Sequence, residues 1–176
     1  MSIPDTKELC GNLGYECITG HFEDMIGNEY DDSVFLLCGA GLLGEEFVSR
    51  HRIINAHPGY SPLARGLDAY KWSIWYDLSL GVTTHLIGEY VDAGEVIERR
   101  DIKIYPYDTF HSVAQRIYEN EIDMLVGAID RIDDEHEMII PPEGSELFKR
   151  MPEEKEIELF ERFDGYKNKH SVQGGR

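Results

Sequence analysis

Apolar residues recur at two periods along the chain, and the period indicates which segments form strands and which form helices. Residues 33–38 form an apolar run of strand length, which the glycines at positions 39 and 41 interrupt. Residues 42–50 then have helical spacing, and a second apolar strand begins at Ile53. A strand, a helix and a strand in so few residues predict a compact parallel βαβ unit.

The same patterns predict elements on both sides of this unit. Residues 81–94 are rich in strand-forming side chains and close in a glycine-bounded turn, and residues 96–104 continue the β region. Residues 109–131 have apolar side chains at helical spacing, which predicts a long amphipathic helix with Asp108 as its N-cap. Residues 133–145 contain two adjacent prolines and are expected to form a loop. Further helical segments are predicted at 6–13, 24–30, 67–75 and 152–163, and a further strand at 15–18.

These elements predict an α/β fold, with a Rossmann-like, mostly parallel sheet flanked by helices. A chain of 176 residues is long enough for one domain with a substantial core. We assign residues 1–166 to that single domain and the polar residues 167–176 to a flexible tail.

Charge and composition narrow the possible partners. The chain has 17 basic and 34 acidic residues, a formal net charge of −17, whereas binding to a nucleic-acid backbone needs clustered cations, so no nucleic acid is expected. No apolar run approaches the roughly 20 residues of a membrane span, and the N-terminus lacks the features of a secretion signal. The three cysteines are irregularly spaced, which is typical of a reducing compartment, so a cytoplasmic protein is expected.

Polar side chains gather at the end of the second strand and after it. Asn55 and His57 are two residues apart, so on a strand they point to the same side, and Pro58 ends the strand directly after them. His85 and Asp92 follow in the next β-rich run. An amide donor, two imidazoles and a carboxylate supply what acyl transfer requires: a donor to a developing oxyanion, a proton shuttle and a charge that tunes the shuttle.

The order and spacing of these residues resemble one enzyme family. The motifs are Asn55-Ala56-His57-Pro58-Gly59, Arg65-Gly66, Gly81-x-Thr83-x-His85 and Val91-Asp92-x-Gly94. From about residue 34 to 104 the chain resembles the folate-dependent formyltransferases, which include glycinamide ribonucleotide transformylase, methionyl-tRNA formyltransferase and the sugar-nucleotide N-formyltransferases. The resemblance implies that Asn55, His57 and Asp92 are the catalytic residues.

The resemblance also implies a reaction and its substrates. N10-formyltetrahydrofolate, the formyl-donor co-substrate, would present its formyl carbon to a primary amine, with no metal. Asn55 would donate to the oxyanion, His57 would shuttle a proton, and Asp92 would favour the charged imidazole. The residues implied to contact folate are Gly41, Leu42, Leu43, Gly88, Glu89, Tyr90 and Val91. Those expected to contact the amine substrate are Tyr60, Arg65 and His85.

Two departures from the family narrow the expected substrate. Family members begin with a strand–helix–strand–helix segment that this chain starts too late to hold in full, so the fold is expected to be shortened at its N-terminus. A C-terminal barrel of the kind that methionyl-tRNA formyltransferase uses on tRNA is not expected, which together with the charge of −17 disfavours a tRNA substrate. Because Arg65-Gly66 resembles the sugar and methionyl-tRNA branches, an amino sugar on a nucleotide is favoured. A shortened sheet would expose an edge or a face, so a homodimer through residues 109–131 is expected.

Four other interpretations stay open. Residues 39–44 match the dinucleotide fingerprint Gly-x-Gly-x-x-Gly, but the next strand ends in Asn55 and His57, where that fingerprint needs an acidic residue. A catalytically inactive folate-binding or scaffold protein would keep the same fold. A deformylase would use the same three residues with water in place of the amine. A metal-assisted hydrolase would use His57, His85 and Asp92.

Overall fold

The computed structural model describes residues 4–21, 26–39, 41 and 43–172. The chain divides into two compact units, residues 1–33 and residues 34–176. In the first unit, helix α1 spans Thr6–Leu13 as predicted. The Asp5 side chain accepts a hydrogen bond from the Glu8 amide at its start, and Gly14 ends it in the left-handed conformation with φ of 79°.

Of the other two predictions for this unit, one is wrong and one is described only in part. The predicted strand at residues 15–18 is wrong, because these residues pair with no other strand and are mostly exposed. The predicted helical turn at residues 24–30 partly lies outside the described residues. Its described end is a single 3-10 turn, η1, at Asn28–Tyr30.

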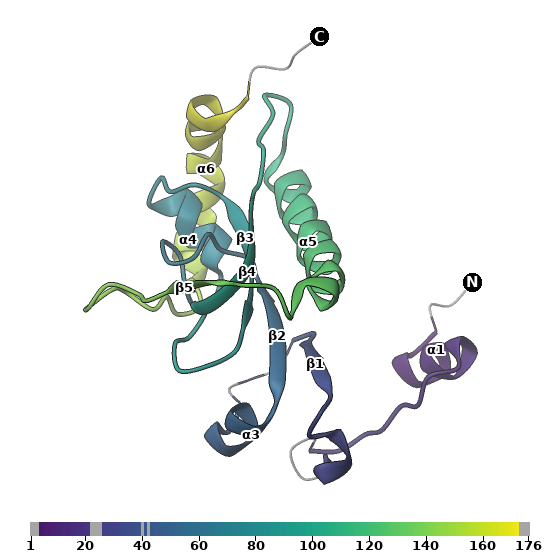
Figure 1. The fold of residues 1–176 in the computed structure, drawn as a ribbon. Coiled ribbons are helices and arrows are strands. Elements are labelled where there is room, and N and C mark those ends of the chain that lie inside the picture. The colour runs from purple at the N-terminus through teal and green to yellow at the C-terminus, as the bar shows by residue number, and fades with distance from the viewer. Residues whose placement is uncertain (1–3, 22–25, 40, 42, 173–176) are drawn as a thin grey trace. The chain divides into compact units, whose positions relative to one another are not determined.

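The second unit is built on a five-stranded sheet, drawn edge-on in Figure 1. Its strands, in spatial order, are β1 (Val34–Leu37), β2 (Arg52–His57), β3 (Gly81–Leu86), β4 (Gly94–Asp101) and β5 (Glu137–Ile139). β1 and β2 run parallel and are joined through helix α3 (Glu45–Arg50), which confirms the α/β class and the predicted βαβ unit.

The sheet as a whole is mixed rather than mostly parallel. β2–β3, β3–β4 and β4–β5 are antiparallel pairs. The register explains the first reversal: Thr83, near the start of β3, pairs with His57, the last residue of β2. The connection through helix α4 (Ala69–Trp75) therefore leaves and re-enters the sheet at the same end. β5 falls in a segment that the sequence predicts to be a loop.

Helices cover both faces of the sheet. α5 (Phe110–Gly127) lies on one face, and α4 and α6 (Glu153–His170) lie on the other (Figure 1). Ile54 of β2 packs in a core cluster with Leu125 of α5 and with Ala128 and Ile132 beyond it. A larger cluster joins apolar residues of α4, α5, α6, β3 and the segment after β4.

Both long helices differ from their predicted ends. α5 begins after Thr109 rather than Asp108, because Thr109 and Ser112 form a reciprocal capping box. Asp108 is drawn away from the cap by Arg116, whose guanidinium donates two hydrogen bonds to its carboxylate, at 2.7 and 2.8 Å. α6 continues past its predicted end at 163 to His170, into residues assigned to the tail. In the part of the chain that the structure describes, no helix is both long and apolar enough to cross a membrane.

Candidate active site

Strands β2 and β3 bring two of the polar residues into direct contact. Asn55 stands opposite His85 in the antiparallel register, as His57 does opposite Thr83, so these side chains share one face of the sheet. The Asn55 Nδ2 atom lies 3.3 Å from Nε2 of His85. The register of β3 against β4 shifts between Thr84 and His85, an irregularity of the kind that often re-aims side chains beside functional sites.

Asp92 reaches the same face from the turn between β3 and β4, where it adopts a left-handed backbone conformation with φ of 50°. Its Oδ1 atom lies 3.5 Å from Nδ1 of His57 and 4.0 Å from Nε2 of His85. Its Oδ2 atom accepts a 2.8 Å hydrogen bond from the Gly66 amide, and its backbone carbonyl accepts one of 2.7 Å from the Ser61 hydroxyl. The structure therefore places His57 and His85 around the Asp92 carboxylate, with Asn55 in contact with His85.

The His57 ring is held in one orientation by the backbone. Its side chain is only 4% exposed, and Nε2 lies 2.9 Å from the Ala64 carbonyl oxygen. A carbonyl can only accept, so Nε2 carries the proton and donates it. Nδ1 is then left facing Asp92, and a second proton taken up there forms a charge-assisted hydrogen bond with the carboxylate.

His85 is fixed in the same manner and is still more enclosed. It is 1% exposed, and its Nδ1 lies 3.2 Å from the Leu86 carbonyl oxygen, to which it donates. Burial lowers the pKa of His85, while the nearby Asp92 charge opposes this shift. The neutral ring then presents the Nε2 lone pair to the Asn55 amide. One N–H of Asn55 is occupied in this way, and the other remains for a reacting oxygen.

Two residues that the sequence assigns to the amine substrate hold the site together. The Arg65 guanidinium donates to the Val91 carbonyl and to the Ser145 hydroxyl, both at 2.9 Å, and the residue is 8% exposed. The Tyr60 ring packs on the start of β3, where a side chain at Gly81 would lie 2.5 Å from its Cδ2 atom. These contacts favour a supporting role for both residues.

The residues implied to contact folate lie on two segments. Gly88, Glu89 and Tyr90 line a hollow of about 150 Å³ with Met138 and neighbours on both sides of Asp92 in the sequence. Val91 is exposed. Gly41 and Leu43 follow β1, whose last residue pairs with Asn55, and Leu42 lies outside the described residues. The hollow is smaller than the pockets of several hundred Å³ that enclose whole ligands, so it has room for part of a folate only.

Sequence reasoning missed the Ser61 hydroxyl and the Gly66 amide, which donate to Asp92, and the Ser145 hydroxyl, which accepts from Arg65. A backbone amide leaves no mark in a sequence except, here, the glycine that allows its close approach. Ser145 lies in a segment with no periodic pattern. Among the described residues, no group of three or more His, Cys, Asp or Glu side chains is arranged to hold a metal ion.

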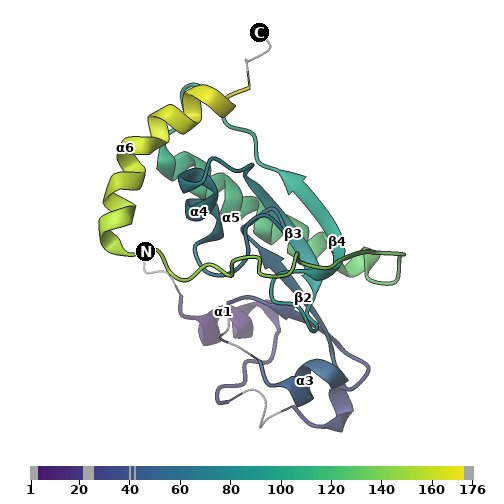
Figure 2. The ribbon, with the colours of Figure 1, turned by 90° about the vertical axis from the view of Figure 1, so that its left-hand side faces the viewer.

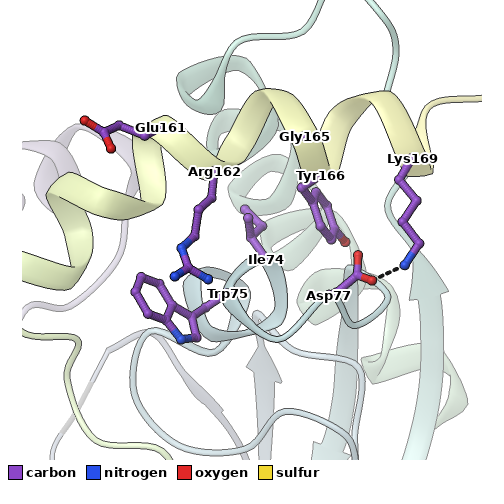
Figure 3. Close-up of a pocket in the computed structure, with 8 residues that line it drawn as sticks. All are labelled: Ile74, Trp75, Asp77, Glu161, Arg162, Gly165, Tyr166 and Lys169. Carbon is purple, nitrogen blue, oxygen red and sulfur yellow. Dashed lines mark hydrogen bonds and ion pairs between the residues drawn. The ribbon is translucent and has the colours of Figure 1, made fainter.

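A larger hollow, of about 410 Å³, lies between α4 and α6 (Figure 3). Three of its charged side chains have partners: Asp77 pairs with Lys169 and also with His170, and the Arg162 guanidinium lies 4.0 Å from the centre of the Trp75 ring. It contains none of the residues that surround Asp92. The chemistry therefore gathers at the β2–β3 face.

Comparison with known proteins identifies the family. Residues 27–129 match the model of the family described as formyl transferase. The dTDP-4-amino-4,6-dideoxyglucose formyltransferase of Mycobacterium tuberculosis is 34% identical over 83 residues, which cover 47% of this chain and 36% of that protein. The phosphoribosylglycinamide formyltransferase of Haemophilus influenzae is 32% identical over 106 residues, covering 56% and 50%. The chain thus spans about a third to a half of the length of these curated relatives.

Solved structures resemble the fold over a larger share of the chain. The formyltransferase PseJ from Anoxybacillus kamchatkensis, in complex with UDP-4,6-dideoxy-4-formamido-L-AltNAc and tetrahydrofolate, has a TM-score of 0.63 at 24% identity. The match covers 93% of this chain and 90% of that one. A 4-N formyltransferase from Francisella tularensis has a TM-score of 0.61 at 22% identity, covering 80% and 63%.

Proposed function

Because the chain belongs to the formyl transferase family, we propose that it transfers a formyl group from N10-formyltetrahydrofolate to a primary amine of a small molecule. The observation that carries this proposal is the convergence of Asn55, His57 and Asp92. The imidazoles of His57 and His85 face the Asp92 Oδ1 atom, and the Asn55 amide contacts His85, so a hydrogen-bond donor, a proton carrier and a carboxylate lie on a face shared by two strands.

The reaction follows from these groups. The amine nitrogen attacks the formyl carbon, and the free N–H of Asn55 donates to the oxygen as it becomes an oxyanion. The attacking nitrogen then loses a proton to the His57–Asp92 pair. The intermediate collapses with loss of the tetrahydrofolate nitrogen, which takes up a proton as it leaves. His57 returns to its starting state when the proton passes on.

We propose an amino sugar on a nucleotide as the acceptor. The dTDP-amino-sugar formyltransferase at 34% identity supports this class, as does the formamido sugar nucleotide bound by PseJ. The tetrahydrofolate in the PseJ complex supports the folate donor. In this chain, the hollow at Gly88–Tyr90 and the loop after β1 are the segments proposed to contact it.

The test is a tetrahydrofolate-release assay with N10-formyltetrahydrofolate and a panel of amino-sugar nucleotides. Wild type is compared with His57→Ala and with a control variant, His111→Ala. His111 is an exposed histidine at the start of α5, away from the site. The proposal predicts turnover that is lost in His57→Ala and kept in His111→Ala. Release without any amine would instead identify a deformylase. Folate binding with no turnover for any amine would identify an inactive binder.

We also propose a homodimer through α5. Its outward side carries an exposed apolar stripe of Tyr118, Ile122 and Val126, and exposed Ile129 follows just beyond its end. Multi-angle light scattering at micromolar concentration is expected to give twice the chain mass. Val126→Lys is expected to give a monomer, whereas Ile157→Lys, an exposed apolar position on α6, is expected to leave the dimer intact. A monomeric wild type would contradict this proposal.

A further inference from the structure

Asp92 is held from outside the part of the chain that matches the family. The family match ends at residue 129, whereas the segment Ser145–Met151, here called the strap, contacts the loop that carries Arg65 and Gly66. The strap belongs to the light green chain that leads into α6 in Figure 2. It lies after β5 and contains no helix or strand of its own.

The strap forms backbone hydrogen bonds with the loop on both sides of Gly66. The Phe148 amide donates to the Arg65 carbonyl at 2.8 Å, and the Leu67 amide donates to the Phe148 carbonyl at 2.9 Å. Gly66 has a φ of 96°, and a Cβ atom there would lie 2.2 Å from the Phe148 carbonyl oxygen. Only glycine permits this approach. The Gly66 amide is the group that donates to the Asp92 carboxylate.

A second link runs through Arg65. Its guanidinium bridges the Ser145 hydroxyl of the strap and the carbonyl of Val91, the residue before Asp92. Two links therefore lead from the strap to Asp92: one, through the backbone at Gly66, fixes its carboxylate, and the other, through the Arg65 side chain, fixes the backbone before it.

The strap itself is firmly anchored. The Phe148 ring stacks on Trp72, with ring centres 5.3 Å apart, and on Tyr76, at 5.6 Å. The Trp72 indole donates to the Lys149 carbonyl, and the Met151 amide donates to the Asp68 carboxylate. These anchors belong to α4 and to the residues that cap its two ends, so the strap connects α4 to the site.

We propose that the strap positions Asp92 for catalysis, with Ser145, Phe148 and Arg65 as positioning residues. This inference rests on the proposed function. A reacting group displaced by about 1 Å loses rate by up to about 10²-fold while substrate contacts persist. Loosening the strap therefore lowers kcat and leaves KM for both substrates unchanged.

Ser145→Ala is the least disruptive variant, because it removes one hydrogen-bond acceptor of Arg65. Ser145→Thr keeps the hydroxyl and is expected to restore the rate. Ser49→Ala is the matched control, since the Ser49 hydroxyl donates to the Glu46 carbonyl within its own helix, α3. We expect about a threefold to tenfold lower kcat in Ser145→Ala. The lost hydrogen bond to a charged group sets the size of this effect, because only part of its free energy is expected to raise the activation barrier.

A second measurement is independent of turnover. Hydrogen exchange of the Gly66 amide, followed by NMR, reports its bond to Asp92 directly. In Phe148→Leu this exchange is expected to accelerate by about tenfold or more, while the Met124 amide in the core of α5 exchanges at its original rate.

The outcomes separate the alternatives. A raised KM for the amine with unchanged kcat would overturn the proposal in favour of direct substrate binding by Arg65. Equal acceleration of exchange at Gly66 and Met124 would overturn it in favour of a general packing role. If exchange accelerates selectively at Gly66 in Phe148→Leu but the wild-type protein shows no turnover, the link from the strap to Asp92 is supported and the proposed function is rejected.

Discussion

Replacing Gly59 by alanine tests the orientation of His57 without replacing a catalytic residue. A Cβ atom on Gly59 would lie 2.3 Å from the Ala64 carbonyl oxygen and 2.5 Å from Nε2 of His57. These are the two atoms of the 2.9 Å hydrogen bond that orients the ring. Contacts of this length do not persist, so either the imidazole or the carbonyl must move, and their bond breaks.

The size of the effect follows from these contacts. Forcing a methyl group into a packed site costs about 1–3 kcal/mol of folding free energy. The hydrogen bond to Ala64 contributes about 1 kcal/mol within that range. Misplacing a reacting group by about 1 Å costs about 10²-fold in rate, equivalent to about 2.7 kcal/mol of activation free energy. We therefore expect a folded Gly59→Ala variant whose kcat/KM is lower by about 100-fold.

The assay is tetrahydrofolate release, with a urea unfolding curve for each variant. Gly165→Ala serves as control, because a Cβ atom there would meet nothing within 4 Å. It lies inside α6, so it is expected to gain about 0.5–1 kcal/mol in stability and to keep its rate. A Gly59→Ala protein that retains at least half of the wild-type kcat/KM would refute the role given to the His57–Ala64 contact.

Three further predictions follow from individual side chains. His85→Ala removes the acceptor that orients Asn55, so kcat is expected to fall about tenfold with KM unchanged, measured by tetrahydrofolate release. Arg116 holds the pKa of Asp108 at about 2, below its ordinary 3.8. The stability gained, about 2 kcal/mol, is present above pH 3.8 and is lost as the pH falls toward 2; urea unfolding of Asp108→Asn is expected to show this loss at pH 7 and little loss at low pH. Burial raises the pKa of Glu121 to about 7 from 4.5, so ionisation costs stability as the pH rises between these values. Solvent screening of this partly exposed side chain reduces the roughly 3 kcal/mol that this shift would give, so Glu121→Gln is expected to gain about 2 kcal/mol at pH 8 and nothing at pH 4, by the same measurement.

The sequence predicts those parts of the site whose residues lie close together along the chain. Asn55 and His57 share a face because strand side chains alternate, and that follows from a spacing of two residues. Asp92 needed more than spacing, because its place depends on how β3 returns to β2. The resemblance of the Val91-Asp92-x-Gly94 turn to a family motif supplied that information. His85 was found as a residue near the site, but its contact with Asn55 required the register.

The parts that could not be predicted depend on distant partners. Apolar periodicity identifies a strand but not its direction. The antiparallel pairing of β2 and β3 depends on the edge of the sheet to which the connection through α4 returns the chain, and the sequence does not reveal that edge. Asp108 and Thr109 are both good N-caps, and the choice between them is made by Arg116 from two turns further along. β5 is three residues long and lies among acidic residues, too short for a periodic signal.

Backbone carbonyl groups orient the two imidazole rings and so give them different roles. Each ring donates one N–H to a carbonyl, His57 to Ala64 and His85 to Leu86, so each turns its other nitrogen toward Asp92. If both rings were charged, two cations would face one carboxylate. Burial lowers the pKa of His85, so it stays neutral and accepts from Asn55, while His57, whose Nδ1 lies 3.5 Å from Asp92, can share a proton with that carboxylate. The two histidines are therefore not interchangeable: exchanging their environments would leave Asn55 without an acceptor and Asp92 without a proton donor.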